Sequence, residues 1–224
     1  PFRDVDIDAV FTSESGNKIT LPGFWNGENE FAVRFAPTEY GVWEYTTKCD
    51  ADESLNGLTG KIGANVYKGD LDIYKHGFIT IQDGNKYFTY ADGTPFFYLG
   101  DTHWSMYTEE MNSAGANAGN IQTDSHFKYI VDKRVEQGFT VYQSEPIGSL
   151  FVVSDGKISK SDVKGFKVAD SYYQYIAQKG LVHANAEFFM SYDMTDKLMN
   201  DDKALETLSR YWAARFSAYP VVWT

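Results

Sequence analysis

Residues 126–145 read HFKYIVDKRVEQGFTVYQSE, and this stretch decides the predicted fold. Phe127, Ile130, Val131 and Val135 recur at the spacing of one face of an α-helix, and Gly138 ends the pattern. The segment FTVYQSE follows at once, and it reads as a strand that ends in polar residues. Helix, glycine and strand in this order are typical of a βα repeat, in which parallel strands form a buried sheet.

The same order recurs on both sides of this stretch. DSYYQYIAQKG (170–180) predicts a helix before the strand LVHANAEFFMSYD (181–193), and DKALETLSRYWAARFSAYP (202–220) predicts a helix before the strand VVWT (221–224). Upstream, the apolar run 96–99 in FFYLGDTHWSMY reads as a strand buried on both faces. The pairs Asp83-Gly84 and Asp92-Gly93 before it are hairpin turn signals. We therefore predict four parallel strands joined by helices.

The first seventy or so residues have a different pattern. Short segments alternate between apolar and polar residues at 5–11, 31–37 and 42–49, with turn residues between them. This pattern predicts an all-β, immunoglobulin-like sandwich over residues 1–72, followed by a βα domain over 73–224. Arg34 is expected on the outer face of the sandwich. Four aromatic residues could form a sugar-stacking patch there, although core and corner positions are favoured: Trp25, Tyr40, Trp43 and Tyr45.

Composition excludes several classes of partner. The net charge of −11 argues against nucleic acid and against an anionic membrane surface, and it fits a neutral ligand better. The single cysteine, Cys49, excludes an internal disulfide and a cysteine zinc site. Aromatic residues make up 17% of the chain, which is compatible with stacking on sugars or with an aromatic core. No stretch reads as a cofactor motif, so we expect no cofactor.

Polar and aromatic residues follow the predicted parallel strands. Because ligands gather at the carboxyl ends of such strands, we expect a shared site there. Its candidate residues are Asp101, His103, Trp104, Tyr107, Gln143, Glu145 and Asp193. Gln143 and Glu145 are two residues apart and share a face of their strand. His183 and Glu187 lie earlier in the next strand and are interpreted as structural.

Six stretches carry a resemblance to a known family. They are PFRDVDIDAVFT, LPGFWNGENEFAVRFAPTEYGVWEYTT and LNGLTG in the first part, and FTYADGTPFFYLGDTHW, KRVEQGFTVYQSE and RYWAARFSAYPVVWT in the second. In this order they resemble bacterial glycoside-hydrolase-like proteins with a DUF5060-type β-sandwich before a DUF4038 (apiosidase-like) barrel. The resemblance implies a (β/α)8 barrel of the retaining-glycosidase type, with the acid/base carboxylate after barrel strand 4 and the nucleophile after strand 7.

The segment VVWT corresponds to barrel strand 4, so the resemblance puts both catalytic carboxylates beyond Thr224. A complete (β/α)8 barrel needs about 250 residues. The expected molecule is therefore the sandwich with the first half of such a barrel, and this fragment should be inactive alone. The seven candidate residues would then bind sugar: the carboxylates accept hydrogen bonds from hydroxyl groups, and Trp104 and Tyr107 stack on a pyranose face. A polysaccharide-degrading enzyme would be secreted, periplasmic or displayed at the cell surface.

The sequence is also compatible with other functions. The barrel could be a degenerate, non-catalytic platform that binds carbohydrate, or a half-barrel that completes itself as a dimer. Asp101, Glu145 and Asp193 could include an in-chain catalytic pair. Asp101, His103 and Glu145 could instead hold a metal ion, although the chain has only 4 histidines and no close pair of them.

Overall fold

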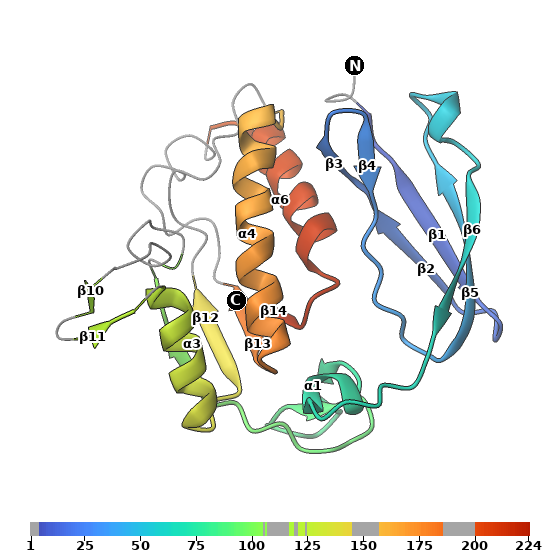
Figure 1. Ribbon diagram of the computed structural model, residues 1–224. Coiled ribbons are helices and arrows are strands. Elements are labelled where there is room, and N and C mark those ends of the chain that lie inside the picture. Colours follow the sequence, from blue (N-terminus) through green and yellow to red (C-terminus); the bar gives the residue numbers. More distant parts are fainter. Residues whose placement is uncertain are drawn as a thin grey trace. The chain divides into compact units, whose positions relative to one another are not determined.

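The computed structural model describes residues 5–104, 106, 117–118, 121–123, 125–144, 157–185 and 200–224 (Figure 1). The chain divides into two compact units. The first unit combines residues 1–67 with 151–166 and 198–218, and the second combines 68–150 with 167–197 and 219–224. The strand-rich N-terminal region thus shares a unit with two later segments, while the domain boundary expected after residue 72 stays a prediction.

The first unit contains an antiparallel sheet in the order β2-β1-β5-β6. Its strands are β1 (Asp8–Ser13), β2 (Lys18–Pro22), β5 (Gly41–Lys48) and β6 (Thr59–Ala64), with a short 3-10 helix η2 (Glu53–Leu55) before β6. A separate hairpin joins β3 (Phe24–Gly27) to β4 (Glu30–Ala32). Alternation places Ala9, Phe11 and Trp43 in the core, where the Phe11 ring stacks on Phe35 at 4.0 Å between centroids.

Trp25 and Trp43 are core residues, as the sequence favours. Trp25 is 4% exposed and Trp43 is 0% exposed. Each indole N–H donates to a backbone carbonyl, from Trp25 to Glu28 at 3.0 Å and from Trp43 to Glu39 at 3.1 Å. These two rings are therefore not available as parts of an exposed stacking patch.

The second unit begins with α1 (Asp72–Lys75) and a hairpin of β7 (Ile79–Thr80) and β8 (Thr89–Tyr90). Gly84 and Gly93 have φ values of 85° and 88°, so both predicted turn signals are confirmed. A second two-stranded ribbon pairs β10 (Asn117–Ala118) with β11 (Ile121–Gln122).

A parallel sheet in the order β14-β13-β12-β9 confirms the predicted βα repeat. Its strands are β9 (Gly100–Thr102), β12 (Val141–Ser144), β13 (Val182–Asn185) and β14 (Val221–Trp223). The connecting segments contain α3 (His126–Glu136), α4 (Lys160–Gln178) and α6 (Asp202–Phe216). Helix α4 begins ten residues before the predicted helix.

The prediction of a fully buried strand at 96–99 is wrong, because the strand begins at Gly100. Phe96 is buried, but Phe97 is 72% exposed and Tyr98 is 39% exposed. The Phe96 N–H donates to the Phe88 carbonyl at 2.9 Å, so the run first pairs with the preceding hairpin segment. It reaches the sheet only at Leu99, whose carbonyl accepts from Val141 at 3.1 Å.

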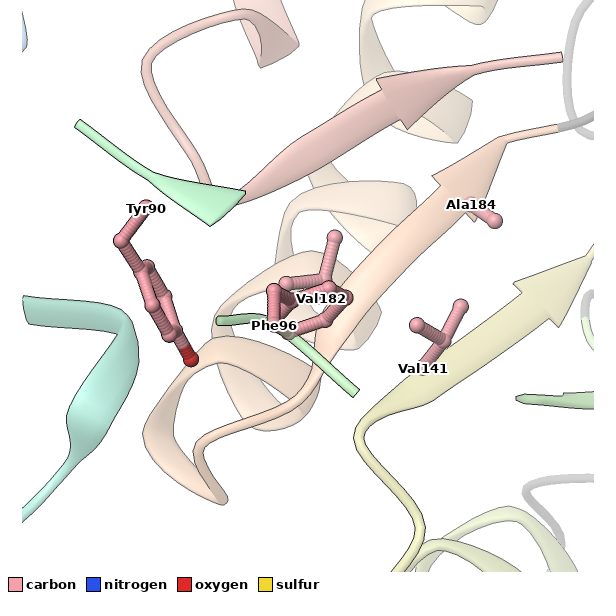
Figure 2. Close-up of a cluster of buried hydrophobic side chains, with 5 residues drawn as sticks. All are labelled: Tyr90, Phe96, Val141, Val182 and Ala184. Carbon is pink, nitrogen blue, oxygen red and sulfur yellow. The ribbon is translucent and has the colours of Figure 1, made fainter. Parts of the chain in front are cut away.

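The two faces of the parallel sheet have different neighbours. On one face, Val141 of β12 and Val182 and Ala184 of β13 form an apolar cluster with Tyr90 and Phe96 (Figure 2). On the other face, the Tyr142 ring packs edge-on against Phe127 of α3, and His183 packs against Tyr173 of α4. The sheet therefore has an apolar-cluster face and a helix-covered face.

Candidate functional site

A polar pair extends the apolar-cluster face at the carboxyl edge of the sheet. Thr102 of β9 is in register with Gln143 of β12, two residues beyond Val141 and on the same side. The Thr102 hydroxyl donates to Gln143 Oε1 at 3.2 Å. Thr102 is exposed and Gln143 is half-buried, so this pair offers hydroxyl and amide groups to a ligand.

Asp101 lies on the opposite, helix-covered face, because it is in register with Tyr142 rather than with Gln143. Its Oδ2 accepts from Arg134 Nε of α3 at 2.6 Å, and the two side chains are 30% and 31% exposed. Arg134 also lies over the Phe139 ring, at 5.2 Å from the centroid. The Asp101 carboxylate thus joins β9 to α3, and the structure does not bring it together with Gln143 on one face.

His103 continues from β9 toward the edge of the sheet. Its backbone N–H donates to the Gln143 carbonyl at 2.8 Å, and its Nδ1 shares a hydrogen bond with the Tyr142 hydroxyl. Burial lowers the pKa of His103 below its ordinary value, although the nearby Asp101 carboxylate opposes this shift. Burial therefore favours the neutral imidazole, which has one ring nitrogen able to donate and one able to accept.

Trp104 follows His103 and is 47% exposed, so part of its indole ring is open to a ligand. Tyr107, Glu145 and Asp193 lie outside the described residues. Within the described part of the chain, no group of three His, Cys, Asp or Glu side chains is arranged to hold a metal ion.

His183 is completely enclosed in the helix-covered face, consistent with its interpretation as structural. It is 1% exposed, and its Nε2 shares a 2.6 Å hydrogen bond with the Ser144 hydroxyl. Burial lowers the pKa of His183 to about 3, so the neutral ring is strongly favoured in the folded protein.

Sequence reasoning did not single out Thr102, Tyr142 or Arg134. The residues predicted at the carboxyl edge of the sheet were identified because each follows an apolar run. The contacts of the three missed residues depend on the pairing of β9 with β12 and on the position of α3. Only Thr102 has a signal in the sequence, because it lies at the end of a predicted strand next to Asp101 and His103.

The chain combines a strand-rich N-terminal region with a parallel βα sheet. Residues 82–224 match the family model described as the apiosidase-like catalytic domain, and residues 1–50 match DUF5060, a domain of unknown function. The first match spans more than half of the chain. The chain therefore belongs to the apiosidase-like family, and the resemblance to DUF5060 and apiosidase-like proteins is confirmed.

Two solved structures from Bacteroides vulgatus ATCC 8482 share the fold. A candidate glycoside hydrolase matches 100% of this chain with a TM-score of 0.76 and 20% identity, and the match covers 45% of that protein. A glycoside hydrolase of family 5 matches 66% of this chain and 32% of its own, with a TM-score of 0.50 and 16% identity. The chain thus spans less than half the length of either protein. None of the curated proteins compared with it matches.

Among the described helices, none combines the length and the apolar character needed to cross a membrane.

Proposed function

We propose that this chain is part of a retaining O-glycoside hydrolase that acts on a polysaccharide or oligosaccharide. In this proposal the parallel sheet is the first half of a (β/α)8 barrel, and the N-terminal strands form an immunoglobulin-like sandwich. Membership of the apiosidase-like family over residues 82–224 is the observation that carries the proposal. The polar pair of Thr102 and Gln143 at the carboxyl edge of the apolar-cluster face supports it, since ligands of such sheets bind at the carboxyl ends of the strands.

The candidate residues have distinct proposed roles in binding the sugar. Thr102 and Gln143 hydrogen-bond to hydroxyl groups, and the neutral His103 imidazole adds one further donor or acceptor. Trp104 stacks on the C–H face of a pyranose or furanose ring. Asp101 contributes by holding β9 against α3, and its remaining oxygen can accept from the ligand. Tyr107, Glu145 and Asp193 remain proposed sugar contacts.

Retaining hydrolysis needs a nucleophilic carboxylate and an acid/base carboxyl group about 5–5.5 Å apart. The family resemblance puts these groups after barrel strands 4 and 7, and β14 is the fourth parallel strand in chain order. Asp101 is a poor candidate for either role because Arg134 already engages it. We therefore place both carboxylates outside these 224 residues, so the chain alone binds its substrate without cleaving it.

The family name indicates a first substrate to test, namely an oligosaccharide that carries apiosyl residues. A neutral glycan is compatible with a chain of net charge −11. Because polymeric glycans are degraded outside the cytoplasm, we propose a secreted, periplasmic or cell-surface location.

Isothermal titration with an apiosyl-containing oligosaccharide tests the binding part of this proposal. Gln143→Leu has a similar size but lacks the side-chain amide, both its carbonyl oxygen and its NH2 group, so affinity should fall about tenfold or more. The control is Gln174→Leu, because the same change is made there at an exposed position of α4. Unchanged binding by Gln143→Leu would contradict the placement of the site. Cleavage of the oligosaccharide by this chain alone would overturn the assignment of the carboxylates.

A further inference from the structure

One cluster of contacts within the first unit is unrelated to the carboxyl edge of the sheet. It centres on Arg215 in the last turn of α6, a side chain that is 0% exposed. Its guanidinium lies over the Phe24 ring of β3 at 4.8 Å and over the Phe166 ring at 5.9 Å. Its Nη1 donates to the Tyr211 hydroxyl at 3.1 Å. An arginine in this position is held by aromatic faces and a hydroxyl group.

The N-terminal strands supply the other half of the cluster. The Tyr211 hydroxyl donates to the Trp25 carbonyl at 2.7 Å, which links α6 directly to the backbone of β3. Arg34 Nη1 donates to the Arg215 carbonyl at 2.5 Å. That carbonyl is at the C-terminal end of α6, where the helix dipole favours a cation. Arg34, expected to lie on the outer face, thus contacts a helix 181 residues further along the chain.

Further ring contacts and an ion pair also join the N-terminal strands to α6. Arg34 lies over Phe24 at 5.3 Å and over Phe216 at 6.0 Å. At one edge, Arg210 forms a 2.8 Å ion pair with Asp8 of β1. A specific interface has these features, namely aromatic rings, a buried arginine and an ion pair at its edge.

We infer that the β3–β4 hairpin and the segment after it, residues 24–35, form a docking surface for α6. Through this surface the N-terminal region acts as a structural clamp on the helix that precedes β14, and not as a separate carbohydrate-binding module. The aromatic side chains of this surface support the clamp, because Phe24 and Trp25 are only 3% and 4% exposed. This inference does not depend on the proposed hydrolase activity.

Hydrogen exchange of the full chain, followed by mass spectrometry, tests the clamp. Arg34→Ala removes the hydrogen bond to the α6 terminus and two ring contacts, so amides in the last turn of α6 should exchange about tenfold faster. Tyr211→Phe removes only the hydroxyl group, and it should accelerate exchange in both β3 and α6. The conservative Tyr211→Phe variant decides the result if Arg34→Ala does not fold.

The matched control is Lys61→Ala, which breaks an exposed ion pair between Lys61 and Glu44 on β6 and β5. It should leave exchange in α6 unchanged. Unaltered α6 exchange in both interface variants, or equal acceleration in the control, would overturn the inference. Slower exchange of residues 24–35 on addition of the oligosaccharide would show a sugar-binding surface there, and it would overturn the clamp as well.

Discussion

A carboxylate near the end of a parallel strand can bind a ligand or fasten a helix, and the face on which it lies decides between them. Asp101 lies on the helix-covered face and is paired with Arg134, whereas Gln143 lies on the apolar-cluster face. The two side chains follow equivalent apolar runs in the sequence, yet their environments differ. The pairing gives Asp101 a measurable structural role beside its proposed role in binding.

Asp101→Asn should lower the free energy of unfolding by about 1 kcal/mol, since it weakens a short, partly buried ion pair. The control is Glu136→Gln, which removes the exposed pair with Lys133 and should cost close to zero. Urea unfolding of both variants at neutral pH measures the difference. If the two variants are equally stable, the Asp101–Arg134 pair does not hold β9 against α3.

His183 should make stability depend on pH. Its folded pKa of about 3 lies below the unfolded value of about 6.5, so the unfolded chain binds more protons between these limits. Stability from this group is complete above pH 6.5 and is lost as pH falls toward 3, by up to about 1.4 kcal/mol per pH unit. Urea unfolding at pH 7, 6 and 5 measures the slope.

His183→Gln removes the titrating group and can still hydrogen-bond to Ser144. Its stability should change less steeply with pH over the same range than that of the wild-type chain. Equal slopes for the two proteins would show that His183 is not held neutral by burial.

At the scale of elements, the helix-to-strand turns depend on glycines in the left-handed region. Gly138, after α3, has a φ of 81° and no heavy atom within 4 Å of an added Cβ. Gly138→Ala should therefore cost about 1 kcal/mol from backbone strain alone. Gly138→Asn should cost less, because asparagine tolerates this conformation better.

Gly63→Ala in β6 is the control for this series. An added Cβ meets nothing within 4 Å there, and the backbone is not in the left-handed region. Thermal unfolding of the three variants should rank them with Gly138→Ala least stable. A Gly63→Ala variant as destabilised as Gly138→Ala would contradict the turn geometry as the cause.

These turns show which parts of the fold can be predicted from sequence. Gly138 and Gly180 each follow a segment with helical spacing of apolar residues. The spacing and the terminal glycine both indicate the end of a helix, so the βα order can be predicted without tertiary information. The run 96–99 misleads because an apolar segment that pairs with a hairpin has the same composition as a buried strand. Contacts such as Thr102 with Gln143 depend on strand register across about forty residues, which no local pattern encodes.

At the scale of the whole molecule, the first compact unit joins the N-terminal strands to α6. This arrangement explains why Arg34 could not be placed from its own neighbours, since the carbonyl of Arg215 and the ring of Phe216, which it contacts, lie in the last 20 residues of the chain. The contact with α6 also gives the N-terminal region a structural role that does not depend on the proposed hydrolase activity. The hydrolase activity is our proposal, and membership of the apiosidase-like family carries it.

The most direct test of that activity is to follow the anomeric proton signals while the full-length gene product acts on the apiosyl-containing oligosaccharide. We expect hydrolysis, with the released sugar first appearing in the anomeric configuration of the substrate, as a covalent glycosyl-enzyme mechanism requires. Product of inverted configuration would contradict the retaining mechanism. Binding of the oligosaccharide without any hydrolysis would contradict the assignment as a glycoside hydrolase.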